Sequence, residues 1–243
     1  MRTVSIEKDP KRIGGMFDRI APTYDLLNHL LSAGMDLWWR RQAIGALRLR
    51  PGMRVLDVAS GTGDLAFAAL GRQPGVRVVG VDLATAMLVR AVAKRRRRGI
   101  EAGRYQVLCG DAMKLPFPAE AFDAAMIAYG IRNVPDLDAA FLEFKRVLKP
   151  GGRLCILEFS MPGSALFRAL YLFYFQHVLP TLGSWVSRDH EAYDYLPASV
   201  GAFQTPRELA RRLQDHGFQM LALRPLFGGV TFHLTARKPG DLR

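Results

Sequence analysis

Cysteine is scarce in this 243-residue sequence, which contains only Cys109 and Cys155. Two cysteines cannot form a disulfide framework, and both lie in apolar runs, so we expect buried thiols in a reducing cytosol. Residues 1–12 lack the apolar run of a signal peptide, and we therefore expect a cytoplasmic protein. The chain also lacks internal repeats and low-complexity linkers. Since a domain usually takes roughly 100–200 residues, we predict a single domain over residues 1–243.

Acidic residues are outnumbered, because 22 Asp and Glu stand against 34 Lys and Arg, which gives a net charge of +12. Such a charge indicates either an anionic partner, such as nucleic acid or a membrane surface, or an arginine-rich composition with no partner attached. The densest cluster, residues 94–98, ends a helical pattern just before Gly99. Cations there suit the negative end of a helix dipole, so we favour a solvated helix end over a dedicated binding patch.

Residues 53–160 alternate between apolar runs of strand length and stretches of helix length. The apolar runs are MRVLDVA, VRVVGVDL, RYQVLC, FDAAMIAY and RLCILEF. Strands that are apolar throughout and separated by helices indicate a parallel sheet covered on both faces. We therefore predict a doubly wound, mostly parallel α/β fold of Rossmann-like type, with a cofactor-binding core at residues 51–160.

The two ends of the chain differ from this core. Residues 1–50 are predicted to form a helical cover. Residues 206–243 are predicted to form a helix that begins at Pro206, followed by two strands. The short connection near Gly228 favours a hairpin, so the last strand should be antiparallel to its neighbour.

Residues 169–187 contain no Asp, Glu, Lys or Arg. The stretch is almost long enough to span a bilayer, but Gln176, His177 and Pro180 in its middle argue against a span. Two interpretations stay open for residues 161–205. They form either a helical lid, inserted after the fifth strand over a hydrophobic ligand, or an ordinary part of the helical core.

A glycine-rich turn follows the first predicted strand. Gly61 and Gly63 lie between that strand and a helix, where they let the backbone approach a ligand closely. Asp82 ends the second predicted strand 19 residues after Gly63, in a place to accept hydrogen bonds from both hydroxyls of a ribose. We favour a nucleoside site here over the alternative, which is a tight turn plus a helix-capping aspartate.

The residues around this turn favour S-adenosylmethionine over a dinucleotide. Asp64 occupies the first turn of the following helix, and Ala66 replaces the third glycine of G-x-G-x-x-G. A carboxylate at that place would repel a pyrophosphate but attract an ammonium or a sulfonium. Asp111, after the third strand, is placed to accept from the amino group of adenine, although by itself it would be interpreted as a turn residue.

Several of these segments resemble the class I S-adenosylmethionine-dependent methyltransferases, over residues 50–160: VLDVASGTGDLA, GVDLATAML, GDAMKLPF and FKRVLKPGGRL. Three further segments resemble one family among them, the ubiquinone/menaquinone biosynthesis C-methyltransferases. They are MFDRIAPTYDLLNHLLSAGMDLWWR near the start, YGIRNVPDLDAAFLEFKRVLKPGGRLCILEFS at 129–160, and HVLPTLGSWVSRDHEAYDYLPASV at 177–200. The run GIRNVP is the most specific element.

This resemblance implies methyl transfer from S-adenosylmethionine to a ring carbon of a polyprenylated hydroquinone such as demethylmenaquinol. Asp36 departs from the family pattern because many members carry histidine there, and Ala128 stands where some members carry a serine at the cofactor. Neither residue is therefore given a role. The residues that the resemblance implies at the cofactor, beside the turn glycines, are Thr62, Asp82, Asp111 and Ala112.

A methyl sulfonium is already a strong electrophile, so the reaction needs alignment, a deprotonated quinol and exclusion of water. Arg132, after the fourth strand, is the candidate to stabilise the quinol oxyanion, with a salt bridge that fixes the loop as the alternative. Asn133 is expected to bond the second oxygen or the loop, and Tyr24 to close over the cofactor unless it is a core aromatic. His177 and His190 are candidate proton acceptors. No ligand spacing indicates a metal site, and direct methyl transfer needs no metal.

The prenyl tail of such a substrate lies in a membrane. We therefore expect basic residues and the 169–187 segment to bring the enzyme, as a peripheral protein, to the anionic inner face of the cytoplasmic membrane. No nucleic acid is expected as a partner, and a homodimer is allowed for.

Three rival interpretations stay open: an RNA or DNA methyltransferase, a non-catalytic module that binds cofactor or prenyl lipid, and a methyltransferase for another lipid or phenolic acceptor. Enzymes that methylate base amino groups usually carry an Asn/Asp-Pro-Pro-aromatic motif after the fourth strand. This chain has Tyr-Gly-Ile-Arg-Asn there, at residues 129–133.

Overall fold

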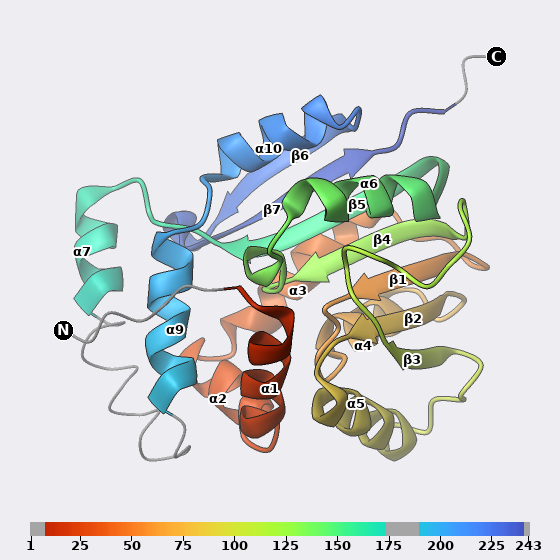
Figure 1. The fold of residues 1–243 in the computed structure, drawn as a ribbon, viewed down its shortest axis with the longest axis horizontal. Helices are drawn as coiled ribbons and strands as arrows, with labels where there is room; N and C mark the ends of the chain where they lie inside the picture. The colour runs from red at the N-terminus through yellow and green to blue at the C-terminus, as the bar shows by residue number, and fades with distance from the viewer. Residues whose placement is uncertain (1–7, 174–189, 241–243) are drawn as a thin grey trace.

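The structure is a computed structural model that describes residues 8–173 and 190–240. Its sheet has the strand order β3-β2-β1-β4-β5-β7-β6 (Figure 1). Strands β1 to β5 are parallel, and β7 is antiparallel to both β5 and β6, which confirms the predicted mostly parallel fold with an antiparallel last strand. The strands are β1 (Arg54–Val58), β2 (Arg77–Asp82), β3 (Tyr105–Cys109), β4 (Phe122–Ala128), β5 (Leu148–Phe159), β6 (Gln219–Leu226) and β7 (Thr231–Arg237).

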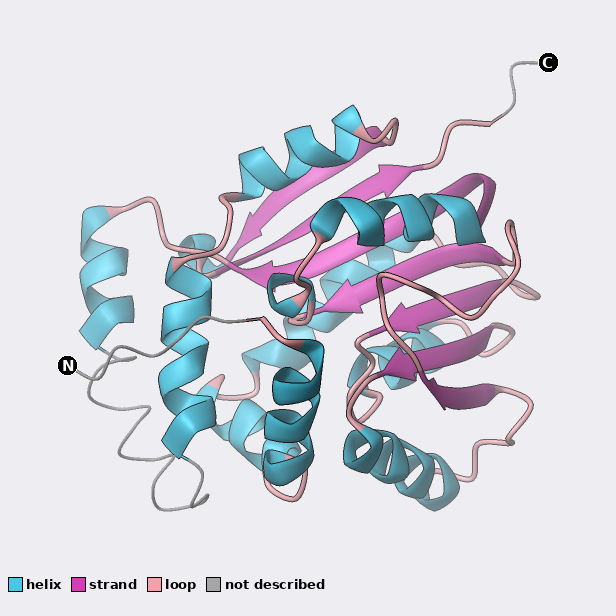
Figure 2. Ribbon diagram, viewed as in Figure 1, coloured by secondary structure: helices cyan, strands magenta, loops and turns pink. Residues whose placement is uncertain are grey.

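Helices cover both faces of the sheet (Figure 2). Two buried clusters fill the space between, because alternate side chains of a strand point to opposite faces. Leu56 of β1 packs with residues of α6 and α10, whereas Val55 packs with residues of α3 and α4. The helices are α1 (Pro10–Ile20), α2 (Tyr24–Leu31), α3 (Met35–Leu47), α4 (Asp64–Arg72), α5 (Thr85–Arg97), α6 (Leu137–Val147), α7 (Ala165–Phe173), α9 (His190–Gly201) and α10 (Pro206–Asp215), with the 3-10 turns η1 (Ile131–Asn133) and η3 (Phe227–Gly229).

The two N-terminal helices lie over the edge of the sheet where the parallel strands end (Figure 1). Ile13, Met16 and Ile20 of α1 form a small apolar cluster with Met87 of α5. The carboxylate of Asp18 accepts a hydrogen bond from the backbone N–H of Ala86 at 2.7 Å. This bond places a negative charge at the first turn of α5, where the helix dipole favours it. The segment predicted as a helical cover therefore has both an apolar and a polar attachment to the sheet domain.

The insertion between β5 and α10 contains α7 and α9. Helix α9 packs against α1 and η1, and its Tyr195 is buried in the α1 cluster. The rest of the insertion, including most of the uncharged run 169–187 and the candidate His177, lies outside the described residues. Within residues 8–173 and 190–240, no helix combines the length and the apolar character that crossing a membrane requires.

The two cysteines differ in exposure. Cys155 on β5 is buried, and burial raises the pKa of its thiol to about 12. Cys109 is exposed, so its predicted burial was wrong. The reason is its place in the sheet: β3 is an edge strand, and Cys109 is its last residue.

The loops that follow β1 and β4 pack closely against each other. A side chain on Gly130, after β4, would bring its Cβ to 2.5 Å from the Cβ of Ala59, after β1. We expect Gly130→Ala to lower the free energy of unfolding by about 1–3 kcal/mol, because the loops must separate. Gly45→Ala is the matched control, since Gly45 lies in α3 with nothing within 4 Å. It should raise stability by about 0.5–1 kcal/mol. Urea unfolding measures both, and a Gly130→Ala variant as stable as the parent would contradict the packing argument.

Candidate active site

A pocket opens at the edge of the sheet where the parallel strands end, between β1 and β4. Strand order reverses at this point, and open α/β sheets bind ligands there. The pocket region takes in about 760 Å³, including the open space at its mouth. Its walls come from α1, α2 and the loops that follow β1 to β4. The predicted site residues that line it are Tyr24, Gly61, Asp82, Asp111, Ala112 and Asn133.

The glycine turn has the tight form that the sequence predicts. Gly63 has a positive φ of 88°, and a Cβ on it would lie 2.5 Å from the hydroxyl oxygen of Tyr105, so no side chain fits. Helix α4 begins at the next residue, Asp64. The backbone N–H of Gly61 donates to Oδ2 of Asp82 at 2.7 Å. Gly63 thus shapes the turn, whereas Gly61 lines the pocket.

The two carboxylates predicted at the nucleoside are both in the pocket wall. Asp82 ends β2, and its Oδ1 accepts from the N–H of Ala84 at 2.8 Å. Burial raises its pKa, and these backbone N–H groups oppose the rise. Asp111 accepts from the N–H of Met113 at 2.8 Å, which is the turn role considered as its alternative. Asp111 therefore combines that turn with a place in the pocket wall.

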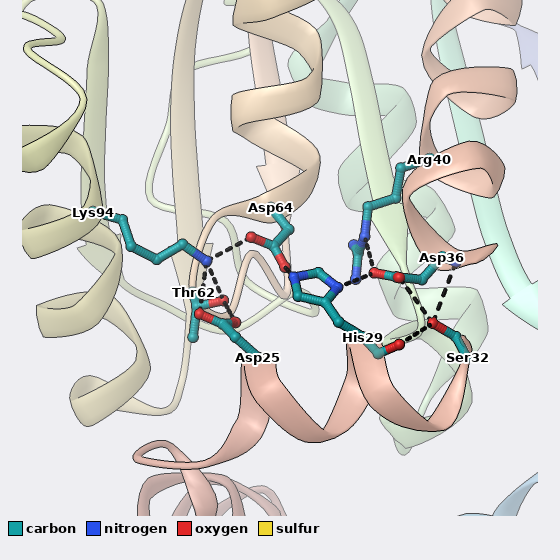
Figure 3. A network of polar contacts seen from close by, with 8 residues as sticks. All are labelled: Asp25, His29, Ser32, Asp36, Arg40, Thr62, Asp64 and Lys94. Atoms are coloured by element: carbon teal, nitrogen blue, oxygen red, sulfur yellow. Dashed lines mark hydrogen bonds and ion pairs between the residues drawn. The ribbon is translucent and has the colours of Figure 1, made fainter. Parts of the chain in front are cut away.

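Thr62 belongs to a polar network behind the pocket (Figure 3). Its hydroxyl donates to Asp25 of α2 at 2.5 Å and accepts from Nζ of Lys94 at 3.1 Å. Lys94 also forms ion pairs with Asp25 at 2.9 Å and with Asp64 at 2.5 Å. The lysine therefore joins α2, α5 and the start of α4. Its assignment to a solvated helix end was wrong, because the side chain points into this network (Figure 3).

Asp64 is ionised, as the sequence argument about the cofactor requires. Burial alone would raise its pKa, but Arg40 and Lys94 outweigh burial and hold the pKa below its ordinary value. His29 lies on the other side, with Nε2 3.9 Å from Asp64 and Nδ1 2.9 Å from Asp36. A negative charge at this turn suits a cationic ligand and disfavours a pyrophosphate.

Among the described residues, His29, Asp36 and Asp64 form one group that is compact enough to hold a metal ion. Two side-chain cations already contact its carboxylates: Lys94 pairs with Asp64, and Arg40 lies 3.5 Å from Asp36. Their charges oppose the entry of a further cation. We therefore interpret the group as an ion-pair network.

Asp57 lies on β1 directly behind the glycine turn. It is 1% exposed, and the backbone N–H of Ala66 in α4 is a hydrogen-bond donor to its carboxyl group. Burial raises its pKa to about 8, and Arg40 and this hydrogen bond partly oppose the rise.

Arg132 is held by chain atoms on three sides. Its Nη1 contacts buried Glu158 at 2.7 Å and the carbonyl of Tyr129 at 2.6 Å, and its Nε contacts Ser199 of α9 at 3.3 Å. Arg132 is 5% exposed and is not among the pocket-lining residues. These contacts favour the alternative weighed for it, a salt bridge that fixes the loop, and its role at an oxyanion stays a prediction.

Three of the other residues named in the sequence analysis line the pocket, whereas the side chain of a fourth is not described. Asn133 lines the pocket, and its Oδ1 accepts from the hydroxyl of Tyr195 at 3.1 Å. Tyr24 lines the pocket from α2, and burial raises its pKa. Ala128, given no role, lines the pocket as well. His190 begins α9, and its side chain lies outside the described part.

Sequence reasoning missed the partners of these residues. Asp25, Lys94 and Glu158 were given no role in the site, yet they hold Thr62, Asp64 and Arg132 in place. The i,i+4 spacing of Asp36 and Arg40 was the one local signal of the network. The other pairs join segments far apart in the chain, where spacing carries no information.

Solved structures of similar shape identify the class of fold. The cyclase SpnF matches with a TM-score of 0.71 and 21% identity, over 94% of this chain and 96% of its own. A SAM-dependent methyltransferase from Aquifex aeolicus matches with a TM-score of 0.59 and 18% identity, over 82% of this chain and 88% of its own. The fold is therefore that of the class I S-adenosylmethionine-dependent methyltransferases.

Sequence relatives define the family more narrowly. Residues 5–238 match the model of the ubiE/COQ5 methyltransferase family, and the chain belongs to that family. A demethylmenaquinone methyltransferase of Thermus thermophilus is 47% identical over 91% of this chain and 100% of its own length. A ubiquinone/menaquinone biosynthesis C-methyltransferase of Syntrophotalea carbinolica is 48% identical over 93% of this chain and 94% of its own. The protein is thus an S-adenosylmethionine-dependent methyltransferase. The wall of its pocket contains the carboxylates of Asp82 and Asp111, which are hydrogen-bond acceptors.

The raised pKa of Asp57 predicts a pH-dependent stability. Its folded-state pKa of about 8 lies above that of an unfolded aspartate, so folding favours the protonated form. The free energy of unfolding should fall by about 1.4 kcal/mol per pH unit between roughly pH 4 and pH 8 on account of this group. The Asp57→Asn variant lacks the titrating carboxyl, so its free energy of unfolding does not fall with pH on account of this residue. The free energy of unfolding of the variant minus that of the parent should therefore increase up to about pH 8 and stay constant above it.

Urea unfolding between pH 5.5 and 8.5 without ligand measures this difference. Asp123→Asn serves as the control, since the pKa of Asp123 is lowered and its carboxylate stays ionised across this range. A constant difference between Asp57→Asn and the parent over these pH values would show that the Asp57 carboxyl does not titrate there.

Proposed function

We propose that this methyltransferase methylates a ring carbon of a prenylated hydroquinone, with demethylmenaquinol giving menaquinol as its reaction in respiratory quinone biosynthesis. The observation that carries the proposal is the 47% identity to a demethylmenaquinone methyltransferase along the whole of that relative's length. The apolar part of the pocket wall supports it, since a naphthoquinol ring is flat and largely apolar. These wall residues are Pro10, Ile13, Phe17, Leu83, Met87, Val134 and Pro135.

S-Adenosylmethionine, when bound, supplies an electrophilic methyl group on a sulfonium. The ionised quinol oxygen pushes electron density to the neighbouring ring carbon, which forms the new C–C bond as the S–C bond breaks. The ring proton then passes to a base, the role for which the sequence offers His177 and His190, aromaticity returns, and S-adenosylhomocysteine is released. The chain has three tasks in this step: to align the two reactants, to exclude water and to stabilise the oxyanion.

Cofactor contacts are proposed for the residues around the glycine turn and after β2 and β3. Asp82 would accept from the ribose, and Asp111 with Ala112 would meet the adenine edge. Gly61 would let the backbone approach, whereas Thr62 and Gly63 would shape the turn from behind. Phe17 and Tyr24 lie in an edge-to-face pair with ring centroids 6.0 Å apart, and both line the pocket. These rings would exclude water from the methyl group.

Arg132 and Asn133 are proposed to act on the quinol oxygens. Asn133 lies in the pocket wall, where its amide can donate to an oxygen. Arg132 would hold η1 through Glu158, and its Nη2 has no hydrogen-bond partner among the described residues. That nitrogen is the donor we assign to the oxyanion, because the guanidinium stays charged at any physiological pH.

The acceptor is tested by single-turnover transfer from labelled S-adenosylmethionine to chemically reduced, short-chain demethylmenaquinol. We expect label in the reduced acceptor and none in the oxidised quinone, because only the quinol has an electron-rich ring. Transfer to neither, with cofactor still bound, would contradict the proposal. Reduced benzoquinol would then be tested as the acceptor.

The same assay tests Arg132. Arg132→Lys keeps the charge but loses the planar fork, so single-turnover transfer should slow by about 10²- to 10³-fold. Affinity for S-adenosylhomocysteine should stay within about twofold, since the proposed cofactor contacts do not include Arg132. Arg146→Lys is the matched control, because Arg146 pairs with Glu143 on α6, outside the pocket wall. Equal rates for the two variants would contradict the assignment.

We also propose that the enzyme meets its prenylated substrate at a membrane surface through exposed apolar side chains. Those of α7 are Leu166, Phe167, Leu170, Leu172 and Phe173. The surface continues to η3, because a side chain on Gly228 would meet the Phe167 ring at 3.0 Å. It then reaches α3, where the exposed Phe227 has its ring 6.3 Å from that of Trp39, and the preceding residue, Trp38, is exposed.

The arginine cluster 95–98 is not part of this surface. It lies at the end of α5, toward the edge where the parallel strands begin, whereas α7 lies beyond the edge where they end (Figure 1). A flat bilayer in contact with α7 would therefore leave the cluster on the opposite side. The proposed docking rests on apolar burial and not on these arginines.

Flotation with vesicles tests the docking surface. We expect the parent protein to float with anionic vesicles, and the double variant Leu166→Asp with Leu170→Asp to lose at least tenfold in recovery, because each leucine contributes about 1.5–3 kcal/mol when buried. Leu142→Asp is the control, since Leu142 is 58% exposed on α6. Flotation of the double variant at the parent's level would refute this surface, as would failure of the parent to float at low salt.

A further inference from the structure

Helix α9 directs two hydroxyl groups toward η1, the turn that carries Arg132 and Asn133. The hydroxyls belong to Tyr195 and Ser199, which are four residues apart and therefore lie on one face of the helix. Both side chains are buried, with 5% of Tyr195 and 3% of Ser199 exposed. One helix face thus contacts both side chains that are proposed to act on the quinol oxygens.

Tyr195 holds the amide group of Asn133. Its hydroxyl donates to Oδ1 of Asn133 at 3.1 Å, and burial raises the pKa of this phenol, so it keeps its proton and stays a donor. The Tyr195 ring is itself held in the apolar cluster with Ile13 and Met16 of α1. The oxygen of the Asn133 amide is therefore engaged on the α9 side. Its Nδ2 gives no hydrogen bond within the described residues and is left for a ligand in the pocket.

Ser199 holds the guanidinium of Arg132 in a similar way. Its hydroxyl donates to the carbonyl of Leu196 at 2.9 Å, and its oxygen accepts from Nε of Arg132 at 3.3 Å. On the other side, Nη1 of Arg132 donates to Glu158 and to the carbonyl of Tyr129. A planar guanidinium that is bonded at both Nε and Nη1 has a fixed plane. The direction in which its Nη2 points is therefore fixed as well.

The ring and the hydroxyl of Tyr195 have separate tasks. Figure 1 shows α9 beside α1, and the ring supplies the apolar contact between these two helices. The hydroxyl adds nothing to that contact, and its printed partner is the Asn133 side chain on η1. Loss of the hydroxyl alone would therefore keep α9 packed and release the amide.

We propose that Tyr195 and Ser199 are positioning residues for methyl transfer, which orient Nδ2 of Asn133 and Nη2 of Arg132 toward the two oxygens of the quinol. Each acts through its partner, and neither lines the pocket. Their role rests on the proposed function, which assigns these two donors to the quinol oxygens. Orientation of this kind has a measurable effect, because a donor misplaced by about 1 Å can slow a reaction by about 10²-fold.

Single-turnover transfer to reduced demethylmenaquinol measures the role of Tyr195. Tyr195→Phe keeps the ring and loses the donor, so the rate at saturating acceptor should fall about tenfold, while affinity for S-adenosylhomocysteine stays within about twofold. In an Asn133→Ala background the same substitution should change the rate by less than about twofold, because Tyr195 acts through Asn133. Equal slowing in both backgrounds would show that Tyr195 only supports the fold, and would overturn the proposal.

Ser199→Ala is measured in the same way. It should slow transfer by about threefold to tenfold in the parent and have no further effect in the Arg132→Lys variant, which lacks the Nε donor. Thr235→Val is the matched control, because it removes another buried hydroxyl, one that contacts Sγ of Cys155 on β5 and lies outside the pocket wall. Its rate should stay within about twofold of the parent rate. A Ser199→Ala variant as fast as this control would overturn the role of Ser199.

A measurement on the side-chain amide needs neither an acceptor nor a stable variant. The sequence contains two asparagines, Asn28 and Asn133, so labelling with ¹⁵N-asparagine gives two side-chain amide groups in an NMR spectrum. The Asn133 amide should be as ordered as the backbone in the parent and should become mobile in Tyr195→Phe, whereas the Asn28 amide should keep its order. An Asn133 amide that is already mobile in the parent would overturn the proposal.

These outcomes differ from failure of the proposed function. If the parent transfers label to no quinol, the proposed acceptor is wrong, and the order of the Asn133 amide still decides whether Tyr195 positions it. If the parent methylates the quinol and Tyr195→Phe is equally fast, the acceptor is correct and the positioning role is wrong.

Discussion

The ion pairs of Lys94 are the interaction on which the rest of the site depends. Without this ammonium, the carboxylates of Asp25 and Asp64 would repel each other across the glycine turn, against the hydrogen bond from Thr62 to Asp25 that joins α2 to this turn. The pairs are partly buried, so removal of the lysine would leave two carboxylates without a compensating charge in a place that solvent screens only in part. The lysine thereby holds Asp25 of α2 and Asp64 of α4 together at the glycine turn, next to the ligand pocket.

Contacts with helix α5 hold the two N-terminal helices over the edge of the sheet where the parallel strands end. Its first turn donates to Asp18 of α1, and Lys94 near its other end bonds Asp25 of α2. Between these two points, Met87 packs into the apolar cluster of α1. Residues of α1 and α2 therefore complete a pocket whose other walls come from the strand ends. The N-terminal helices are therefore walls of the pocket in which we propose that the cofactor binds.

Much of this architecture could be predicted from the sequence, because it depends on local patterns. Apolar runs between helices predict the parallel strands, and the turn from Gly61 to Asp64 with Asp82 after β2 predicts the ligand edge. The polar network could not be predicted, since Asp25 and Lys94 are 69 residues apart and Arg132 and Glu158 are 26 apart. Only the fold brings such pairs together. Cys109 shows the same limit: its exposure follows from the edge position of β3, which no local pattern reveals.

Hydrogen–deuterium exchange of the 243-residue chain, with and without S-adenosylhomocysteine, tests whether α1 and α2 contribute to cofactor binding. We expect the amides of α1 and α2 to exchange more slowly in the complex, together with those of the loops after β1 and β2, because binding stabilises the arrangement in which these helices cover the pocket. Protection of those loops with unchanged exchange in α1 and α2 would contradict this expectation.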